Sequence, residues 1–284
     1  MSLLAPFDPW KSKICTCPKK LSLSAYTGCS HRCLYCYASS YIRNFYCLRP
    51  KKDFLQRLGK EIKKVPANSF ITMSNSCDPY LSLEKDLKLT RSCLEILKDY
   101  NLRIMLVTKS SLILRDLDLL KKLKKLVVCI TVTTLNEDLA KKLEAGAPPV
   151  CQRLKAMKKI SQFAPVVCRL DPLIYPLNTN EIGKIIKEAK RAGSCQIITS
   201  TYKAKPDNFR RMIESFPELK STWSRLYLQE GQKRGRYIFL AKELRKPLIE
   251  EVRRACLRES IDFSSCREGF ASLNTKRCDG SSFF

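Results

Sequence analysis

Three cysteines stand close together in the segment TGCSHRCLYCYA, residues 27–38. Cys29, Cys33 and Cys36 have the spacing C-x3-C-x2-C and lie among polar and aromatic residues. A structural zinc site needs four protein ligands, and a disulfide needs two cysteines. A set of three therefore predicts a metal centre that keeps one coordination position open.

The composition is that of a large globular protein. The chain has 284 residues, of which 44% are hydrophobic and 28% charged, and it contains 15 cysteines. No uninterrupted apolar run approaches the roughly 18 residues of a membrane span, and the opening residues MSLLAPFDPWKSK lack the apolar core of a signal peptide. We therefore expect a cytoplasmic protein with no membrane partner. In a reducing compartment its cysteines would be metal ligands or small buried hydrophobic residues.

The charge is strongly positive. Lys and Arg number 53 against 27 Asp and Glu, which gives a net charge of +26. Residues 1–70, which include the cysteine loop, carry 13 basic and 3 acidic side chains. Such a field favours a nucleic-acid partner, because phosphates release counterions when basic side chains neutralise them. The alternative is a lysine-coated surface that only keeps the protein soluble.

Short β-branched apolar runs alternate with amphipathic, lysine-rich segments along the chain. The runs predict strands at residues 21–27, 69–75, 103–108, 127–133, 166–172 and 196–200. The amphipathic segments predict helices at residues 53–64, 89–100, 114–125, 152–163 and 180–191. This order predicts an α/β fold with parallel strands and right-handed crossovers. A doubly wound sheet and a partial barrel both fit it.

In either architecture the site lies at the carboxyl ends of the strands. Polar, cysteine and lysine residues collect there, in the cysteine loop, NSCDPY (75–80), TKSS (108–111), TTLNED (133–138), DPLIYPLNTN (171–180) and STYK (200–203). Each segment alone also fits an ordinary turn that caps a helix. Together they predict an active site.

The loop GCSHRCLYCYA resembles the signature of the radical S-adenosylmethionine (SAM) superfamily, which has an aromatic residue before its last cysteine, here Tyr35. Further blocks resemble the spore photoproduct lyase-like group, often labelled DNA repair photolyase. They are NSCDPYLSLEKDLKLTRSCLEIL (75–97), LVTKSSLILRDLDLL (106–120), ITVTTLNEDLAKKLEAGAPPVCQRLKAM (130–157), PLIYPLNTNE (172–181), CREGF (266–270) and LNTKRCDGSSF (273–283). The resemblance is strong over residues 20 to 200 and looser in the tail.

This resemblance implies a partial (β/α)6 TIM-type barrel of the radical SAM type. The barrel would span residues 21–202, after an N-terminal extension at residues 1–20. A basic, cysteine-containing C-terminal extension at residues 203–284 would close it and could carry a second metal site.

The resemblance also implies the cofactors. Cys29, Cys33 and Cys36 would bind three irons of a [4Fe–4S] cluster, and the fourth iron would bind SAM. An electron donor such as ferredoxin or flavodoxin would reduce the cluster. The expected SAM contacts are Ser76 and Cys77 for the amino group, Lys109 for the carboxylate, Thr131 and Thr133 as lesser candidates, and Tyr35 near the adenine. A lysine suits the carboxylate independently, because its point charge offsets an anion.

Cys77 departs from the family pattern, which usually has Thr before Asp-Pro-Tyr. A thiol beside the substrate could return a hydrogen atom to a product radical, although the resemblance implies such a cysteine nearer to Asn75. The alternative is a plain SAM-contacting or buried thiol. His31, the only histidine, is either a polar loop residue or a general acid.

Cysteines in the tail and at the start suggest a second metal. Cys256, Cys266 and Cys278 occur in the last 30 residues, and Cys15 or Cys17 could complete four ligands for an iron–sulfur cluster or zinc. Their spacing matches no short zinc motif.

Three functions follow from these observations. The first is a lyase-like radical SAM enzyme that repairs or modifies a DNA base, which it would flip out and stack on the aromatic residues of TWSRLYL (222–228) and GRYIF (235–239). The second is the same chemistry on RNA such as tRNA. The third is a non-catalytic metal protein that binds nucleic acid.

Overall fold

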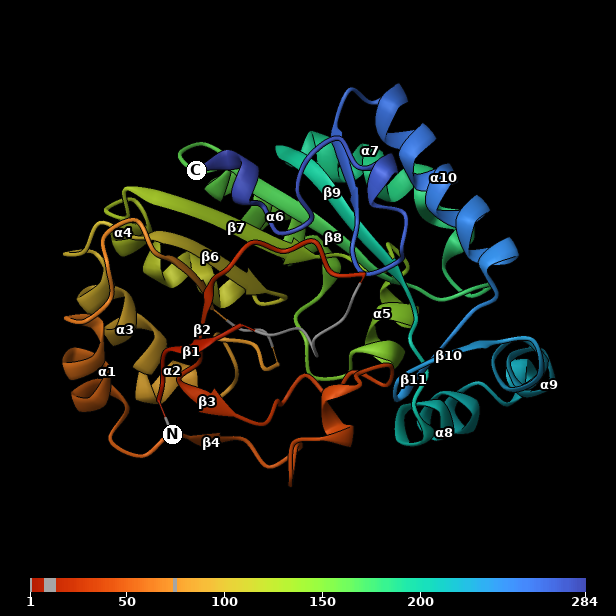
Figure 1. Cartoon of the computed structure of the whole chain (residues 1–284), viewed down its shortest axis with the longest axis horizontal. Helices are drawn as coiled ribbons and strands as arrows, with labels where there is room; N and C mark the ends of the chain where they lie inside the picture. Colours follow the sequence, from red (N-terminus) through yellow and green to blue (C-terminus); the bar gives the residue numbers. More distant parts are fainter. Residues whose placement is uncertain (1, 8–13, 74–75) are drawn as a thin grey trace.

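A computed structural model describes residues 2–7, 14–73 and 76–284. Its main feature is an eight-stranded sheet with the order β1-β2-β5-β6-β7-β8-β9-β12 (Figure 1). The strands are β1 (Ala5–Pro6), β2 (Leu21–Leu23), β5 (Phe70–Met73), β6 (Arg103–Thr108), β7 (Lys125–Thr131), β8 (Val166–Leu173), β9 (Ser194–Thr201) and β12 (Asp262–Ser265). All neighbouring pairs are parallel except β1 with β2.

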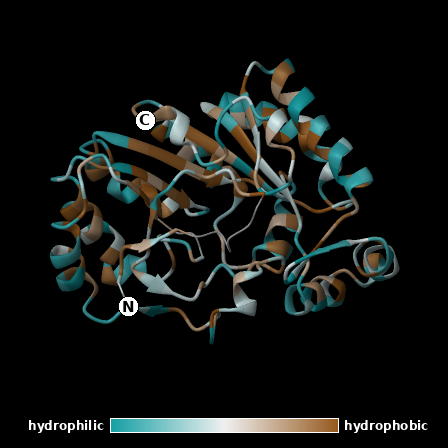
Figure 2. Ribbon diagram, viewed as in Figure 1, coloured by the Kyte–Doolittle hydropathy of each residue, from teal (hydrophilic) through white to brown (hydrophobic). Residues whose placement is uncertain are grey.

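Helices connect the parallel strands and cover the outer face of the sheet. They are α1 (Phe54–Ile62), α2 (Glu84–Leu87), α3 (Leu89–Leu97), α4 (Leu117–Leu120), α5 (Glu137–Leu143), α6 (Val150–Ile160) and α7 (Ile182–Arg191). Their buried residues recur at helical spacing, as in Ile182, Ile185, Ile186 and Ala189 of α7, while the lysines of α7 face outward (Figure 2). The predicted alternation of strands and helices is confirmed, and the curved, mostly parallel sheet is the partial barrel.

The C-terminal residues form α8 (Pro206–Ser215), α9 (Lys220–Trp223), the hairpin β10 (Gln232–Arg234) and β11 (Tyr237–Phe239), and α10 (Lys242–Arg258). The strand β12 then pairs in parallel with β9, so this extension adds a strand to the sheet. The expected first strand, residues 21–27, is shorter than predicted. It ends at Leu23, and β3 (Tyr26–Thr27) pairs instead with β4 (Arg49–Pro50), which anchors both ends of the cysteine loop. The division at residues 20 and 202 remains a prediction.

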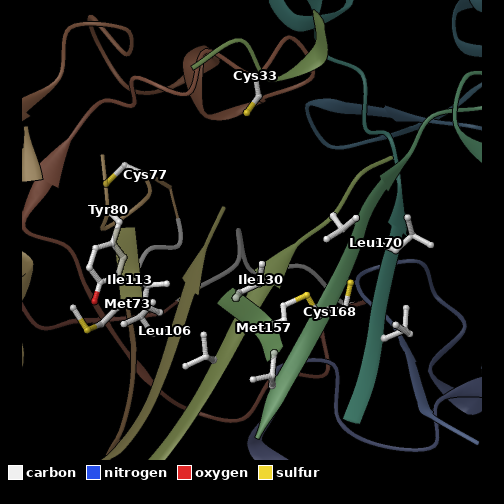
Figure 3. Close-up of a cluster of buried hydrophobic side chains, with 14 of the residues drawn as sticks. Cys33, Met73, Cys77, Tyr80, Leu106, Ile113, Ile130, Met157, Cys168 and Leu170 are labelled. Carbon is white, nitrogen blue, oxygen red and sulfur yellow. The ribbon is translucent and has the colours of Figure 1, made fainter. Parts of the chain in front are cut away.

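The two faces of the sheet carry different cores. Leu106, Val128 and Ile130 pack toward the helices in the main hydrophobic core, part of which Figure 3 shows. The alternate residues of the same strands, such as Met105, Val127 and Cys129, belong to a second cluster on the concave face. The period of two along each strand explains this division.

The C-terminal tail covers part of the concave face. The Phe284 ring lies 5.1 Å from that of Phe70, and Gln196 Nε2 donates to the Arg277 carbonyl at 3.0 Å. Gly280 has φ +73°, and a Cβ there would lie 2.9 Å from Val127 Cγ1. The tail therefore runs directly against the strands, which places Cys278 in the interior.

No helix in the described part of the chain combines the length and apolarity needed to cross a membrane.

Candidate active site

A cavity of about 540 Å³ opens at the carboxyl ends of the strands. The cysteine loop covers it: Cys29, Cys33 and Cys36 all line it, as do Ser76, Cys77, Lys109 and Thr131. Figure 3 shows Cys33 with its sulfur directed from the loop toward the strands, and Cys77 on the facing segment. The structure thus brings most of the predicted site residues together in one cavity. Thr133 is buried close by, hydrogen-bonded to the same network as Tyr35.

Two close backbone approaches fix the loop. At Gly28, with φ +84°, a Cβ would lie 2.6 Å from the Phe45 carbonyl oxygen, so the turn requires glycine. At Gly146 a Cβ would lie 1.9 Å from the Ser30 carbonyl oxygen, and its N–H donates to the His31 carbonyl at 2.9 Å. Gly146 belongs to the GAPP segment after α5, so that segment is a support for the loop.

Helix α8 holds the loop from the other side. Arg211 Nη2 donates to the Cys36 carbonyl at 2.8 Å, and Arg211 Nε donates to the Leu34 carbonyl at 3.2 Å. Asn208 Nδ2 donates to the Tyr35 carbonyl at 2.9 Å. These residues of the C-terminal extension were not predicted from the sequence, because no local pattern relates a helix near residue 210 to a loop near residue 35.

Burial dominates the electrostatics of the three thiols. Desolvation raises the pKa of Cys29 to about 12 and also raises those of Cys33 and Cys36. Lys109 and Arg211 act in the opposite direction on Cys36. Three buried thiols that face a shared cavity from one short loop fit a cluster with three cysteine ligands, because iron binding would replace their protons.

A buried network centres on Glu144, which the sequence analysis missed. Tyr35 and Arg153 contact its carboxylate through short hydrogen bonds, and Thr133 Oγ1 donates to it at 2.7 Å. Burial alone would raise the pKa of Glu144, but Arg153 and Lys109 outweigh burial and lower it to about 2. The hydroxyl groups of Tyr35 and Thr133 are therefore engaged with a carboxylate, and Glu144 orients both residues.

Lys109 lies between this network and the cysteines. Its Nζ is 3.9 Å from Glu144 Oε1 and 5.8 Å from the centre of the Tyr35 ring. Burial favours the neutral amine, but Cys33 and Glu144 outweigh burial and raise the pKa of Lys109. The ammonium ion is thus available to an anionic group in the cavity.

Asp78 ties the segment after β5 to the end of β6. It accepts hydrogen bonds from Thr108 Oγ1 and the Lys109 N–H, both at 2.7 Å. His31 Nδ1 lies 3.8 Å from Asp78, but burial lowers the pKa of His31, so the imidazole is neutral at neutral pH. This environment favours the polar loop residue over the general acid.

Cys77 is buried and keeps its proton. Its Sγ lies 2.8 Å from Ser24 Oγ and donates to the Tyr26 carbonyl at 3.2 Å. Desolvation raises the pKa of Cys77 to about 11. Asn75, close to where the resemblance implies a hydrogen-donating cysteine, lies outside the described residues.

Aromatic and basic side chains cluster at one end of the cavity, and we call them the aromatic rim. Tyr37, Tyr41 and Arg267 line the cavity, and Tyr237 and Lys205 pack against them. The Tyr37 and Tyr237 rings meet edge to face at 5.6 Å, and Lys205 Nζ lies 4.6 Å from the centre of the Tyr237 ring. Tyr41 is 45% exposed, whereas Tyr237, Lys205 and Arg267 are buried. Tyr237 belongs to the GRYIF segment, whose role in stacking on a base remains a prediction.

The expectation for TWSRLYL is wrong. Trp223 is fully buried, with its Nε1 donating to the Tyr175 carbonyl at 2.8 Å, and Tyr227 is packed beside Tyr202. Both are core residues, because α9 and the following turn pack their apolar side against the protein.

The five cysteines proposed for a second metal do not all meet. Cys256 lies on the buried face of α10. Burial raises its pKa, and the other groups that raise it are Cys168 and Asp262, neither of which belongs to the proposed set. Its inclusion is therefore wrong. Cys15, Cys17, Cys266 and Cys278 do come together, as described below.

Comparison with known proteins agrees with this site. The profile of the Radical SAM superfamily matches residues 23–189, more than half of the chain, and the protein belongs to this superfamily. Its cofactors are accordingly a [4Fe–4S] cluster and SAM. The observed three-thiol loop fits the cluster.

The fold is similar to that of spore photoproduct lyase. A structure of its C140A/S76C mutant with bound AdoMet and dinucleoside spore photoproduct has a TM-score of 0.69 and 16% identity, covering 91% of this chain and 77% of that one. Streptococcus suis SuiB bound to S-adenosylmethionine has a TM-score of 0.54 and 13% identity, covering 87% of this chain and 50% of that one.

Two curated proteins are similar in sequence. An uncharacterized protein of Methanocaldococcus jannaschii is 33% identical over 144 residues, which are 50% of this chain and 55% of that protein. An uncharacterized protein of Acidianus two-tailed virus is 29% identical over 177 residues, 57% of each chain. The chain thus spans little more than half the length of these relatives.

Proposed function

We propose that this radical SAM enzyme acts on a nucleic acid, with a DNA base as the target of repair or modification. The observation that carries the proposal is the aromatic rim, which adjoins the cavity of the cysteine loop. Aromatic rings stack on bases of any sequence, and the buried Arg267 adds positive charge to the cavity wall. Among proteins of similar fold, spore photoproduct lyase binds a dinucleoside photoproduct.

The residues divide the work as follows. Cys29, Cys33 and Cys36 hold the cluster, Lys109 binds the SAM carboxylate, and Ser76 and Cys77 lie where the amino group is expected. When bound, the reduced cluster and SAM supply a 5′-deoxyadenosyl radical that abstracts hydrogen from carbon. Glu144 fixes Tyr35 and Thr133 around this position, and the buried loop keeps water away.

The Cys77 thiol has a second role in this proposal. It carries an S–H bond at neutral pH in the same cavity and would donate its hydrogen atom to a product radical. The thiyl radical left behind would take hydrogen from 5′-deoxyadenosine, which returns the 5′-deoxyadenosyl radical, or would accept one electron from the reductant of the cluster and one proton from solvent. In D₂O the wild-type product should carry one deuterium, and Cys77→Ala should lose this label while still cleaving SAM.

The test of the substrate class uses anaerobically reconstituted protein. Formation of 5′-deoxyadenosine is measured with dithionite and SAM, alone and with single-stranded DNA, duplex DNA, tRNA or basic-protein peptides. We expect DNA to bind and to become modified in its nucleosides by mass spectrometry. Modification of tRNA alone would move the target to RNA, and binding without SAM cleavage would support a non-catalytic protein.

A further inference from the structure

Four cysteines from the two ends of the chain meet on the concave face of the sheet. Cys15, Cys17, Cys266 and Cys278 all line the cavity described above, and Cys17 and Cys266 pack against the apolar cluster that contains Cys278. Thr16 Oγ1 lies 3.8 Å from Cys278 Sγ. We call these four residues the terminal quartet. All are free thiols, so no disulfide explains their meeting.

The quartet lies on the wall of the cavity described above, where Cys278 is buried and the other three cysteines are half-buried. Cys278 belongs to the concave-face cluster with Val127 and Val167, and Cys17 and Cys266 pack against that cluster. In Figure 1 the segment before β2 (red) and the tail (blue) both cross this side of the sheet. Other buried cysteines, such as Cys93, serve as single small hydrophobic residues in the core. Weak thiol hydrogen bonds give little reason to gather four together.

An ion pair lies next to the quartet. Lys20 Nζ is 2.9 Å from Asp279 Oδ2, and both residues line the same cavity as the four cysteines. Asp279 therefore offsets the positive charge of Lys20 near the proposed ion.

We propose that the terminal quartet binds one Zn²⁺ ion through four thiolates. Zinc–sulfur bonds of about 2.3 Å place the sulfurs of a tetrahedral site near hydrogen-bonding distance of one another. Four cysteines are the ligand set of a structural zinc site, which leaves no coordination position open. On binding, the ion replaces the protons still held by the group, which leave to solvent.

The quartet needs a small adjustment to close. Among the described residues, no group of three or more His, Cys, Asp or Glu side chains is already placed to hold a metal ion. The thiols must therefore turn toward one another around the ion, and rotation about the cysteine χ1 angles is the movement that would bring them together.

Zinc at this position would join the two edges of the open sheet. Cys15 and Cys17 lie between β1 and β2, the strand pair at one edge, and Cys266 directly follows β12 at the opposite edge. Cys278 adds the tail. The ion would thus close the concave side next to the cavity, as a structural site with no open position.

The test measures metal in the full chain with Cys29, Cys33 and Cys36 replaced by Ala, so that the loop contributes no iron. After anaerobic growth with zinc and purification, we expect about one zinc per chain by mass spectrometry. Cobalt in its place should give the intense visible bands of a tetrahedral thiolate site. Adding Cys17→Ser or Cys278→Ser should remove both signals.

Cys195→Ser and Cys256→Ser are the matched controls, because Cys195 packs against the same apolar cluster and Cys256 is a buried cysteine elsewhere. Both should retain zinc. Circular dichroism shows whether the serine variants fold. If they do not, the parent protein is titrated with cobalt and its reactive thiols are counted before and after. The bound metal should protect four thiols from the thiol reagent.

Three results would overturn the proposal. One is absence of bound zinc and of cobalt bands in the parent protein. Another is iron with labile sulfide at the quartet, which would mean a second cluster. The third is a protein mass that is lower by two hydrogen atoms for each disulfide, which would show that the thiols of the quartet form disulfides. These outcomes are independent of the nucleic-acid proposal, because none of them uses a substrate.

Discussion

The molecule has two groups of cysteines, and they differ in how the fold makes them. The loop group comes from eight consecutive residues, and its thiols face a cavity from a backbone fixed at Gly28 and Gly146. The terminal quartet comes from both ends of the chain, which meet on the concave face of the sheet. The first arrangement suits a cluster with an open coordination position, and the second suits a closed one.

Their surroundings differ as well. The loop group shares its cavity with Lys109, Cys77 and the aromatic rim, all of which can contact a substrate or cofactor. The quartet lines another part of the same cavity, where it packs against strand side chains and the C-terminal tail. Under the zinc proposal, the same ligand chemistry would serve reaction in one place and closure of the sheet in the other.

The largest effect should come from the loop group itself. Replacing Cys29, Cys33 and Cys36 by Ala should abolish the iron of the SAM-binding cluster and all 5′-deoxyadenosine formation, since no other ligand can replace three thiolates. Iron, sulfide and the electron paramagnetic resonance signal measure this. Cys195→Ser should keep the wild-type cluster. Full iron content in the triple variant would contradict the assignment of the two groups.

The two groups were unequally predictable. Three cysteines within a short segment are visible in the sequence, and the alternating strands and helices place them at the carboxyl ends of a parallel sheet. The quartet depends on contacts between residues more than 200 positions apart, which no spacing rule encodes. The same holds for α8, whose Arg211 reaches the loop only in the folded chain.

The errors had readable causes. Cys256 continues the buried face of α10 formed by Leu248, Ile249, Val252 and Ala255, and this periodicity marks it as a core residue. Its nearness to other cysteines in sequence was misleading. Trp223 and Tyr227 were assigned to stacking on composition alone, whereas aromatic residues more often fill cores.

The next largest effect should follow from removing the cation beside the loop group. Lys109→Met should weaken SAM binding by about 10- to 100-fold, the value of a charge-assisted hydrogen bond, and leave the iron content unchanged. Arg153 still pairs with Glu144 in this variant, so the buried carboxylate keeps a partner. Anaerobic calorimetry measures the affinity, with Lys52→Met as the control. An unchanged dissociation constant would exclude Lys109 from the SAM site.

A smaller effect should show that the loop group depends on the C-terminal extension. Arg211→Ala removes hydrogen bonds to the Leu34 and Cys36 carbonyls, so the loop should lose iron up to about tenfold faster in air or chelator. Arg210→Ala is the matched control, because its side chain is 72% exposed and turned away from the loop. Equal rates of iron loss in the two variants would mean that α8 does not stabilise the cluster loop. Zinc at the quartet should be unaffected in both.

The smallest effect concerns the surface beside the loop group. Arg32, Arg43 and Lys52 are exposed there, whereas Arg49 donates to the carbonyls of Arg43, Asn44 and Cys47 and so maintains the loop instead. Changing the three exposed residues to Gln should weaken nucleic-acid binding only several-fold, because each phosphate contact is modest. The slope of log affinity against log salt should fall by about 2 to 3, at roughly 0.7 to 0.9 per lost contact.

The control variant changes the exposed Lys158, Lys184 and Lys187 of the outer helices to Gln, which removes the same charge from the far side of the sheet. If both variants lower the slope equally, the net charge acts without a defined binding face. If only the first does, the phosphate backbone runs past the cysteine loop toward the aromatic rim, where a base can reach the cavity.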